Sequence, residues 1–198
     1  MKKIIWTAFL ILAPVTVLAQ DPAQVQKLFE AGQYQQVVES TRGNVDPAVL
    51  YTAAQSQQKL GAVDQAAELY GRLAERSSDD PWSLVGRSAR QLVQDDANGA
   101  LESANRAVSI ASNMPEAHYQ LGLVLAKLQR WREAAAAFDR ASELNPSLAY
   151  AHYYGGLMHY RANRPDRMAI HFEQFLKLAP EAPERPEVNQ IMRTVRGR

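Results

Sequence analysis

Apolar residues along most of this chain recur every three or four positions, which is the spacing of one face of an α-helix. Leu121, Val124 and Leu125 form one such stripe, and after a short polar break Ala134 and Phe138 begin a second one. The strict alternation that marks a β-strand does not describe these segments. The pattern therefore predicts pairs of short antiparallel helices joined by tight turns.

The helical pattern also repeats with a period of thirty-four residues. Two tracks of small residues, offset from each other by twelve, keep this period through Ala54, Ser88, Gly122 and Gly156 and through Ala66, Ala100 and Ala134. Two antiparallel helices approach closely only where neither carries bulk, so we expect these seven residues to pack at the crossings within each pair. A period of this length predicts a stacked array of helix pairs.

Prolines mark the start of successive repeats. Pro47, Pro81 and Pro115 are thirty-four residues apart, and Ala149 takes the next place. Proline suits the first turn of a helix, because its missing N–H has no partner there. We expect an array over 22–180 that consists of a partial unit at 22–46 and full units at 47–80, 81–114, 115–148 and 149–180. A last helix within 184–198 would cap it.

The unit 115–148 resembles the tetratricopeptide repeat family, through Leu121, Gly122, Ala134, Phe138, Ala141 and Pro146. The resemblance implies an all-α fold, a right-handed α-α superhelix of antiparallel helix pairs. It also implies that the first helix of each pair lines a concave surface. The unit 149–180 departs from the family at Met168 and Phe175, which are bulkier than the family's alanines. That departure indicates different packing near the end of the array.

The first nineteen residues are typical of a signal peptide. Lys2 and Lys3 precede an uncharged apolar run, which ends in the small-residue site Val17-Leu18-Ala19. Cleavage after residue 19 would make the chain an exported bacterial protein, periplasmic or secreted, with no stable membrane insertion. An uncleaved anchor is the alternative. The chain has no cysteine, which excludes both disulfides and lipid attachment to a cysteine.

Charge argues against nucleic acid as a partner. The whole chain has 22 basic and 21 acidic residues, and without Lys2 and Lys3 the basic count falls to 20. A nucleic-acid-binding protein needs a clustered basic face, which neither the balance nor the pattern supplies.

The concave surface that the resemblance implies is rich in aromatic and basic residues. We expect it to bind a protein or peptide, because tyrosine and tryptophan dominate interface hot spots. The alternative is that these side chains fill the seams between first helices or lie under the final helix. A self-associating envelope assembly factor, hence a homo-oligomer, is a second hypothesis. The predicted groove residues are Tyr51, Lys59, Trp82, Tyr119, Lys127, Tyr150, Tyr153, Tyr160 and Arg161.

The histidines suggest an alternative to a binding scaffold, namely a metal site. His152 and His159 fall on one face of a helix and His171 on its partner helix, and three histidines can bind zinc. A zinc-dependent hydrolase is therefore a third hypothesis. Against it, His152 and His159 occupy packing positions of the repeat, and no phosphate loop or nucleophile elbow occurs in the sequence. We expect a non-catalytic scaffold with no cofactor and no metal site.

Overall fold

The computed structural model describes residues 21–196, and every regular element in that range is an α-helix. The predicted signal peptide at 1–19 lies outside the described residues. The helices are α1 (Pro22–Glu30), α2 (Tyr34–Ser40), α3 (Pro47–Lys59), α4 (Val63–Ala74), α5 (Pro81–Val93), α6 (Ala97–Ile110), α7 (Pro115–Lys127), α8 (Trp131–Leu144), α9 (Ala149–Arg161), α10 (Pro165–Leu178) and α11 (Arg185–Arg196).

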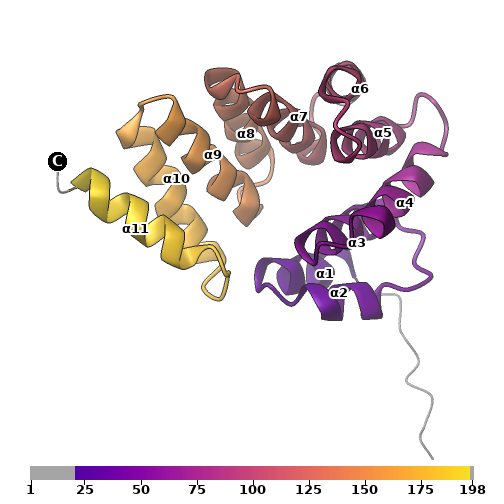
Figure 1. Cartoon of the computed structure of the whole chain (residues 1–198), viewed down its shortest axis with the longest axis horizontal. Helices are drawn as coiled ribbons and strands as arrows, with labels where there is room; N and C mark the ends of the chain where they lie inside the picture. The colour runs from indigo at the N-terminus through magenta and orange to yellow at the C-terminus, as the bar shows by residue number, and fades with distance from the viewer. Residues whose placement is uncertain (1–20, 197–198) are drawn as a thin grey trace, which may run out of the picture.

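The helices form antiparallel pairs that follow one another around an arc (Figure 1). Each helix packs on its neighbours in the sequence, and α11 packs on α10 at the far end. The predicted all-α solenoid is therefore confirmed. None of the helices within 21–196 has both the length and the apolar character needed to cross a membrane.

Local capping explains where the first helices begin. Asp46 accepts hydrogen bonds from the backbone N–H groups of Ala48 and Val49, and Asp80 accepts one from Trp82. The prolines at the starts of α3, α5 and α7 occupy the first turn, where they leave no donor unpaired. Neither Met114 at the start of α7 nor Leu148 at the start of α9 provides a side-chain cap, and α9 differs from the other three in that Ala149 replaces the proline.

The seven predicted packing residues are all buried, and the close approaches are specific. A Cβ atom added at Gly122 would lie 2.8 Å from the ring of Phe138 on the partner helix. One added at Gly156 would overlap the ring of Phe172 still more closely. The hydroxyl of Ser88 donates to the Ala100 carbonyl, 2.9 Å away on α6. Small side chains therefore set the distance between the two helices of a pair.

The two ends of the array meet, which the repeat pattern did not predict. The ring of Phe29 in α1 lies 5.0 Å from the ring of Tyr150 in α9, and the hydroxyls of Tyr34 and Tyr150 are 3.1 Å apart. A Cβ atom at Gly32 would lie 3.0 Å from Pro183 in the segment before α11. The arc is thus closed into a ring rather than left as an open groove.

Two polar contacts hold this closure. The carboxylate of Glu30 in α1 accepts a 3.2 Å hydrogen bond from the backbone N–H of Ala149. It thereby caps α9 from the other end of the array. On the opposite side, Lys59 forms a 2.6 Å ion pair with Glu184 and lies 5.0 Å from the centre of the Tyr150 ring. The alanine at 149 is needed for the first contact, because proline has no N–H to donate.

We predict that Gly122→Ala lowers the free energy of unfolding by about 1–3 kcal/mol, because its methyl group meets the fully buried ring of Phe138. Gly71→Ala is the matched control. Its added Cβ lies 3.6 Å from the nearest Arg90 atom, so the helix preference for alanine should raise stability by about 0.5–1 kcal/mol. Urea denaturation of both variants measures the difference. Equal effects at the two glycines would contradict the assigned packing.

We further predict that Ala149→Pro destabilises the chain by about 1 kcal/mol or more, since buried Glu30 loses a donor. Pro115→Ala is the control, because it changes the same position of a unit that makes no such contact. Chemical denaturation of the variants and of Ala149→Pro combined with Glu30→Gln gives the coupling between the two positions. A coupling near zero would refute the role given to this hydrogen bond.

Candidate functional site

Closure of the ring turns the expected concave surface into an interior. Tyr51, Tyr119, Tyr150 and Tyr153 are only 4%, 4%, 1% and 6% exposed. The rings of Tyr119, Tyr150 and Tyr153 pack on Tyr154, at 6.0, 6.2 and 4.9 Å, whereas the ring of Tyr51 packs on Tyr70 and Trp82. These tyrosines fill the seams between the first helices, which is the alternative that the sequence had left open. Their binding of a partner stays a prediction.

The buried hydroxyls are mostly satisfied within the protein. Tyr51 donates to the side-chain oxygen of Gln120 at 2.8 Å, and Gln120 donates in turn to Ser88 at 3.3 Å. Tyr150 and Tyr153 donate to Glu184 and Glu187 near the start of α11, each at 2.8 Å. Because burial disfavours the phenolate, it raises the pKa of Tyr51 well above 10. The tyrosine side chains are therefore neutral structural donors.

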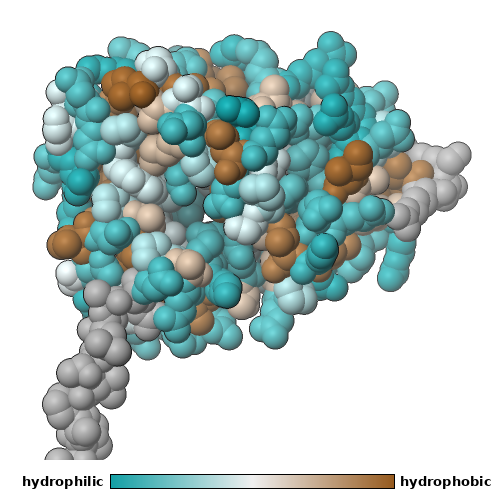
Figure 2. Space-filling model, turned by 180° about the vertical axis from the view of Figure 1, so that it is seen from behind, coloured by the Kyte–Doolittle hydropathy of each residue, from teal (hydrophilic) through white to brown (hydrophobic). Residues whose placement is uncertain are grey.

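A cavity of 360 Å³ lies among the starts of the first helices, and we call it cavity 1. Helices α1, α3, α5, α7 and α9 all contribute to it, so it occupies the centre of the ring. Figure 2 shows the molecule hollowed near the middle of the face opposite to that of Figure 1. The lining of cavity 1 includes Lys27, Phe29, Glu30, Ala48, Tyr51, Gln55, Trp82, Glu116, Tyr119 and Tyr150.

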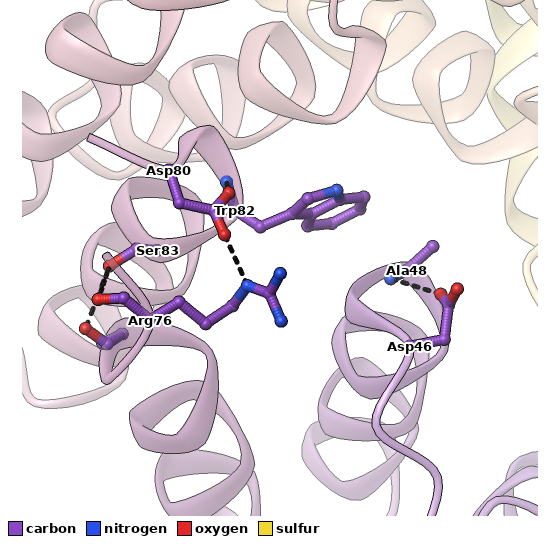
Figure 3. Close-up of polar contacts among 7 residues, drawn as sticks. Asp46, Ala48, Arg76, Asp80, Trp82 and Ser83 are labelled. Atoms are coloured by element: carbon purple, nitrogen blue, oxygen red, sulfur yellow. Dashed lines mark hydrogen bonds and ion pairs between the residues drawn. The ribbon is translucent and has the colours of Figure 1, made fainter. Parts of the chain in front are cut away.

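The position of Trp82 follows from the start of α5. Asp80 caps this helix through the N–H of Trp82 and also pairs with Arg76 at the end of α4. Ser83 donates to the Ala74 carbonyl, which fixes the same turn. With the backbone held on both sides, the indole extends away from α5 toward the space in front of the start of α3 (Figure 3). Trp82 is thus a half-buried aromatic wall of cavity 1.

Two polar groups in cavity 1 have no partner among the side chains of residues 21–195. The carboxylate of Glu116 is paired with no cation there, and the hydroxyl of Tyr119 makes no hydrogen bond there. Burial raises the pKa of Glu116 above its ordinary value, against a smaller effect of its own backbone N–H. Burial also raises the pKa of Glu30, although Gln26 and Ala149 donate to its carboxylate. Cavity 1 therefore combines aromatic walls with one carboxylate, that of Glu116, which has no ion-pair partner among the described side chains, whereas Glu30 has two hydrogen-bond donors and the nearby charge of Lys27.

A second cavity of 300 Å³, cavity 2, opens at the other ends of the first helices. It shares Phe29, Gln55 and Tyr119 with cavity 1 and adds Gln58 and Lys59 from the end of α3. The ammonium of Lys59 is already paired with Glu184. Cavity 2 thus offers less unpaired charge than cavity 1.

The nine predicted groove residues do not form one surface. Tyr51, Trp82, Tyr119 and Tyr150 line cavity 1, whereas Tyr153 lies beside the start of α11. Lys59 belongs to the closure contact and to cavity 2. The other three lie at the ends of α7 and α9 and line neither cavity. Lys127 pairs with Asp95 at 2.7 Å, Tyr160 is 40% exposed, and Arg161 lies 5.9 Å from the centre of the Trp131 ring.

The contribution of α1 was not predicted from the sequence. Phe29 and Glu30 reach cavity 1 from the divergent first pair, which does not keep the thirty-four-residue register. The sequence signal was indirect: Ala149 replaces the proline expected at the start of the last unit, and its N–H is the one that Glu30 accepts.

The histidine positions also differ from expectation in one respect. His152, His159 and His171 lie together, as their spacing suggested, but His159 and His171 are joined by the carboxylate of Asp139 from α8, and His152 contacts His171 alone of these. Within 21–195, the group of side chains able to hold a metal ion is Asp139, His159 and His171.

Comparison with known proteins agrees with this architecture. Tetratricopeptide repeat models match residues 48–80 and 115–148. The solved structure of TTC0263, a thermophilic tetratricopeptide repeat protein of Thermus thermophilus, has a TM-score of 0.63 at 20% identity, covering 89% of this chain and 98% of that one. A crystal structure of MamA has a TM-score of 0.50 at 17% identity, covering 81% and 96%. None of the curated proteins compared with the chain matches it in sequence. The repeat matches, the helix pairs and this likeness of fold together identify the chain as a tetratricopeptide repeat protein.

Proposed function

We propose that this chain is a non-catalytic scaffold that binds a protein segment at cavity 1, through a basic side chain of the partner. The fold itself is that of protein-interaction scaffolds, which present an inner surface built from successive first helices. The proposal that cavity 1 binds a basic side chain rests on the unpaired, partly buried carboxylate of Glu116, which lies among aromatic rings.

An unpaired charge in such a place costs stability, so its presence points to a ligand that supplies the missing partner. A lysine or arginine side chain would pair with Glu116 and lie against the rings of Trp82 and Tyr119, which attract a cation by their π faces. The free hydroxyl of Tyr119 would hydrogen-bond to the backbone of the bound segment. A volume of 360 Å³ accommodates one long side chain and its neighbours, not a folded domain.

We place this activity in the periplasm or outside the cell, on the strength of the signal-peptide pattern at 1–19. The geometry of cavity 1 favours recognition, because it brings a carboxylate next to aromatic walls that attract cations.

A fluorescence titration tests the proposal. Replacing Trp6 and Trp131 by Phe leaves Trp82 as the one tryptophan of the chain. Random hexapeptide pools with one fixed lysine should change the Trp82 emission saturably, whereas matched pools with glutamate at that position should not. Glu116→Gln should weaken the lysine-pool affinity at least about tenfold. The control is Glu133→Gln, an exposed carboxylate on α8 that should leave the affinity unchanged.

Binding of both pools with equal affinity, or equal binding by Glu116→Gln, would refute recognition of a cation at cavity 1. Failure of every pool to change the emission would refute cavity 1 as the binding site.

We also predict a pH signature for the unbound protein. The pKa of Glu116 is raised in the folded state, so the folded chain binds a proton more tightly than the unfolded chain does. The contribution of this group to stability therefore falls as the pH rises above 4.5 toward the raised pKa. Glu116→Gln removes the penalty, and its gain in free energy of unfolding over wild type should be larger at neutral pH than near pH 4. Urea denaturation at several pH values measures this, and a pH-independent difference would contradict it.

A further inference from the structure

The junction between the units 115–148 and 149–180 contains a buried polar cluster that does not line cavity 1. Asp139 of α8, His159 of α9 and His171 of α10 meet there. One carboxylate oxygen of Asp139, Oδ1, lies 2.9 Å from Nε2 of His159 and 2.8 Å from Nε2 of His171. The side chains of the two histidines are 1% and 8% exposed, and that of Asp139 is 25% exposed. Three helices thus direct one oxygen and two nitrogens at a common point.

These atoms are a metal ligand set in number and kind. Two imidazole nitrogens and a carboxylate oxygen are ligands that zinc and related divalent ions take in proteins. All three ligand atoms lie within 4.8 Å of one another. Ligands at about 2.0–2.1 Å from a tetrahedral ion are about 3.3 Å apart, so an ion would need the present contacts to open by roughly 0.5 Å. Side-chain rotation of Asp139, the most exposed of the three, can supply that movement.

The second hydrogen bonds of the histidines determine which nitrogens are free for a metal. Nε2 of His152 lies 3.2 Å from the Pro146 carbonyl, which only accepts, so Nε2 of His152 carries the proton. His118, thirty-four residues earlier, makes the same contact with the Ser112 carbonyl at 2.9 Å. Neutral His152 then accepts through Nδ1 from Nδ1 of His171, 3.3 Å away. With its Nδ1 proton committed to His152, His171 has Nε2 as its metal-binding nitrogen.

For His171 this arrangement matches the surroundings of metal-binding histidines, in which the second ring nitrogen donates to a fixed acceptor and orients the ring. Nδ1 of His159 is buried and makes no hydrogen bond within the described residues. An ion among the three groups would replace the direct contacts of Asp139 with His159 and His171 and would keep the contact of His171 with His152.

We propose that Asp139, His159 and His171 bind one divalent transition-metal ion of the zinc class. Three protein ligands leave the fourth position of a tetrahedral ion open, and because both imidazoles are buried we assign the ion a role in holding the helices together. Its ligands come from α8, α9 and α10, so the ion links the unit 115–148 to the unit 149–180. It would hold rigid the part of the ring on which α1 and α11 close.

Cobalt titration tests the site directly. The purified chain, treated with a chelator and dialysed, is titrated with Co²⁺, whose visible absorption reports tetrahedral coordination. We expect saturation at one ion per chain, displacement of the Co²⁺ by one equivalent of Zn²⁺, and a Zn²⁺-dependent rise in Tm. Because the chain has no cysteine, thiolate binding cannot produce the signal.

Variants assign the ligands. His171→Gln and Asp139→Asn should lose the Co²⁺ spectrum and weaken binding by at least about tenfold, while helical circular dichroism confirms that they fold. Asp139→Asn keeps the size of the side chain, so it separates ligand loss from packing loss. His118→Gln is the control, since His118 makes the same carbonyl contact as His152 outside the cluster. Absence of a Co²⁺ spectrum in the wild-type chain, or equal binding by wild type and His171→Gln, would overturn the proposal.

Discussion

The contact between α1 and α9 decides the shape of this molecule. A solenoid of stacked helix pairs is normally held by neighbours alone, each pair touching the next. Here Phe29 and Tyr34 pack on Tyr150, and Glu30 caps α9 from more than a hundred residues away. These contacts add a long-range constraint to an otherwise local fold. They convert a curved array with two free ends into a closed ring.

Closure has a chemical consequence at the centre of the ring. It places the tyrosines of the first helices in a medium where charge is costly, and it leaves Glu116 there with no ion-pair partner among the side chains of residues 21–195. The rest of the interior is neutral or hydrogen-bonded, as the pairing of Tyr51 with Gln120 shows. The Glu116 carboxylate and the Tyr119 hydroxyl are the exceptions at the centre of the ring, because neither has a partner among the side chains of residues 21–195. An exception of that kind is best explained by a ligand that completes it.

The sequence predicted the local fold well, because the fold follows from local rules. The period of thirty-four residues and the glycines that face Phe138 and Phe172 specify helix pairs and their spacing. The candidate site was harder to predict, because it depends on where the two ends of the array meet. α1 lies outside the repeat register, so no spacing relates Glu30 to Ala149. For the same reason, the sequence could indicate which residues face the concave side, but it could not predict that closure buries them.

The histidine cluster shows a similar limit. The seven-residue spacing of His152 and His159 places both on one helix, and the repeat places His171 on the next. The carboxylate that completes the group comes from α8 of the preceding unit. Which of several surface carboxylates turns inward depends on the packing of three helices. A periodic pattern cannot specify that choice for a single residue.

Closure of the ring is the claim on which cavity 1 depends, and a distance measurement tests it most directly. Because the chain has no cysteine, Gln33→Cys and Glu181→Cys attach spin labels to two exposed positions only, one on each side of the contact between Gly32 and Pro183. Pulsed electron spin resonance should give a single short and narrow distance distribution. A broad distribution centred at long distances would show that the ends are apart in solution and would contradict the closed ring.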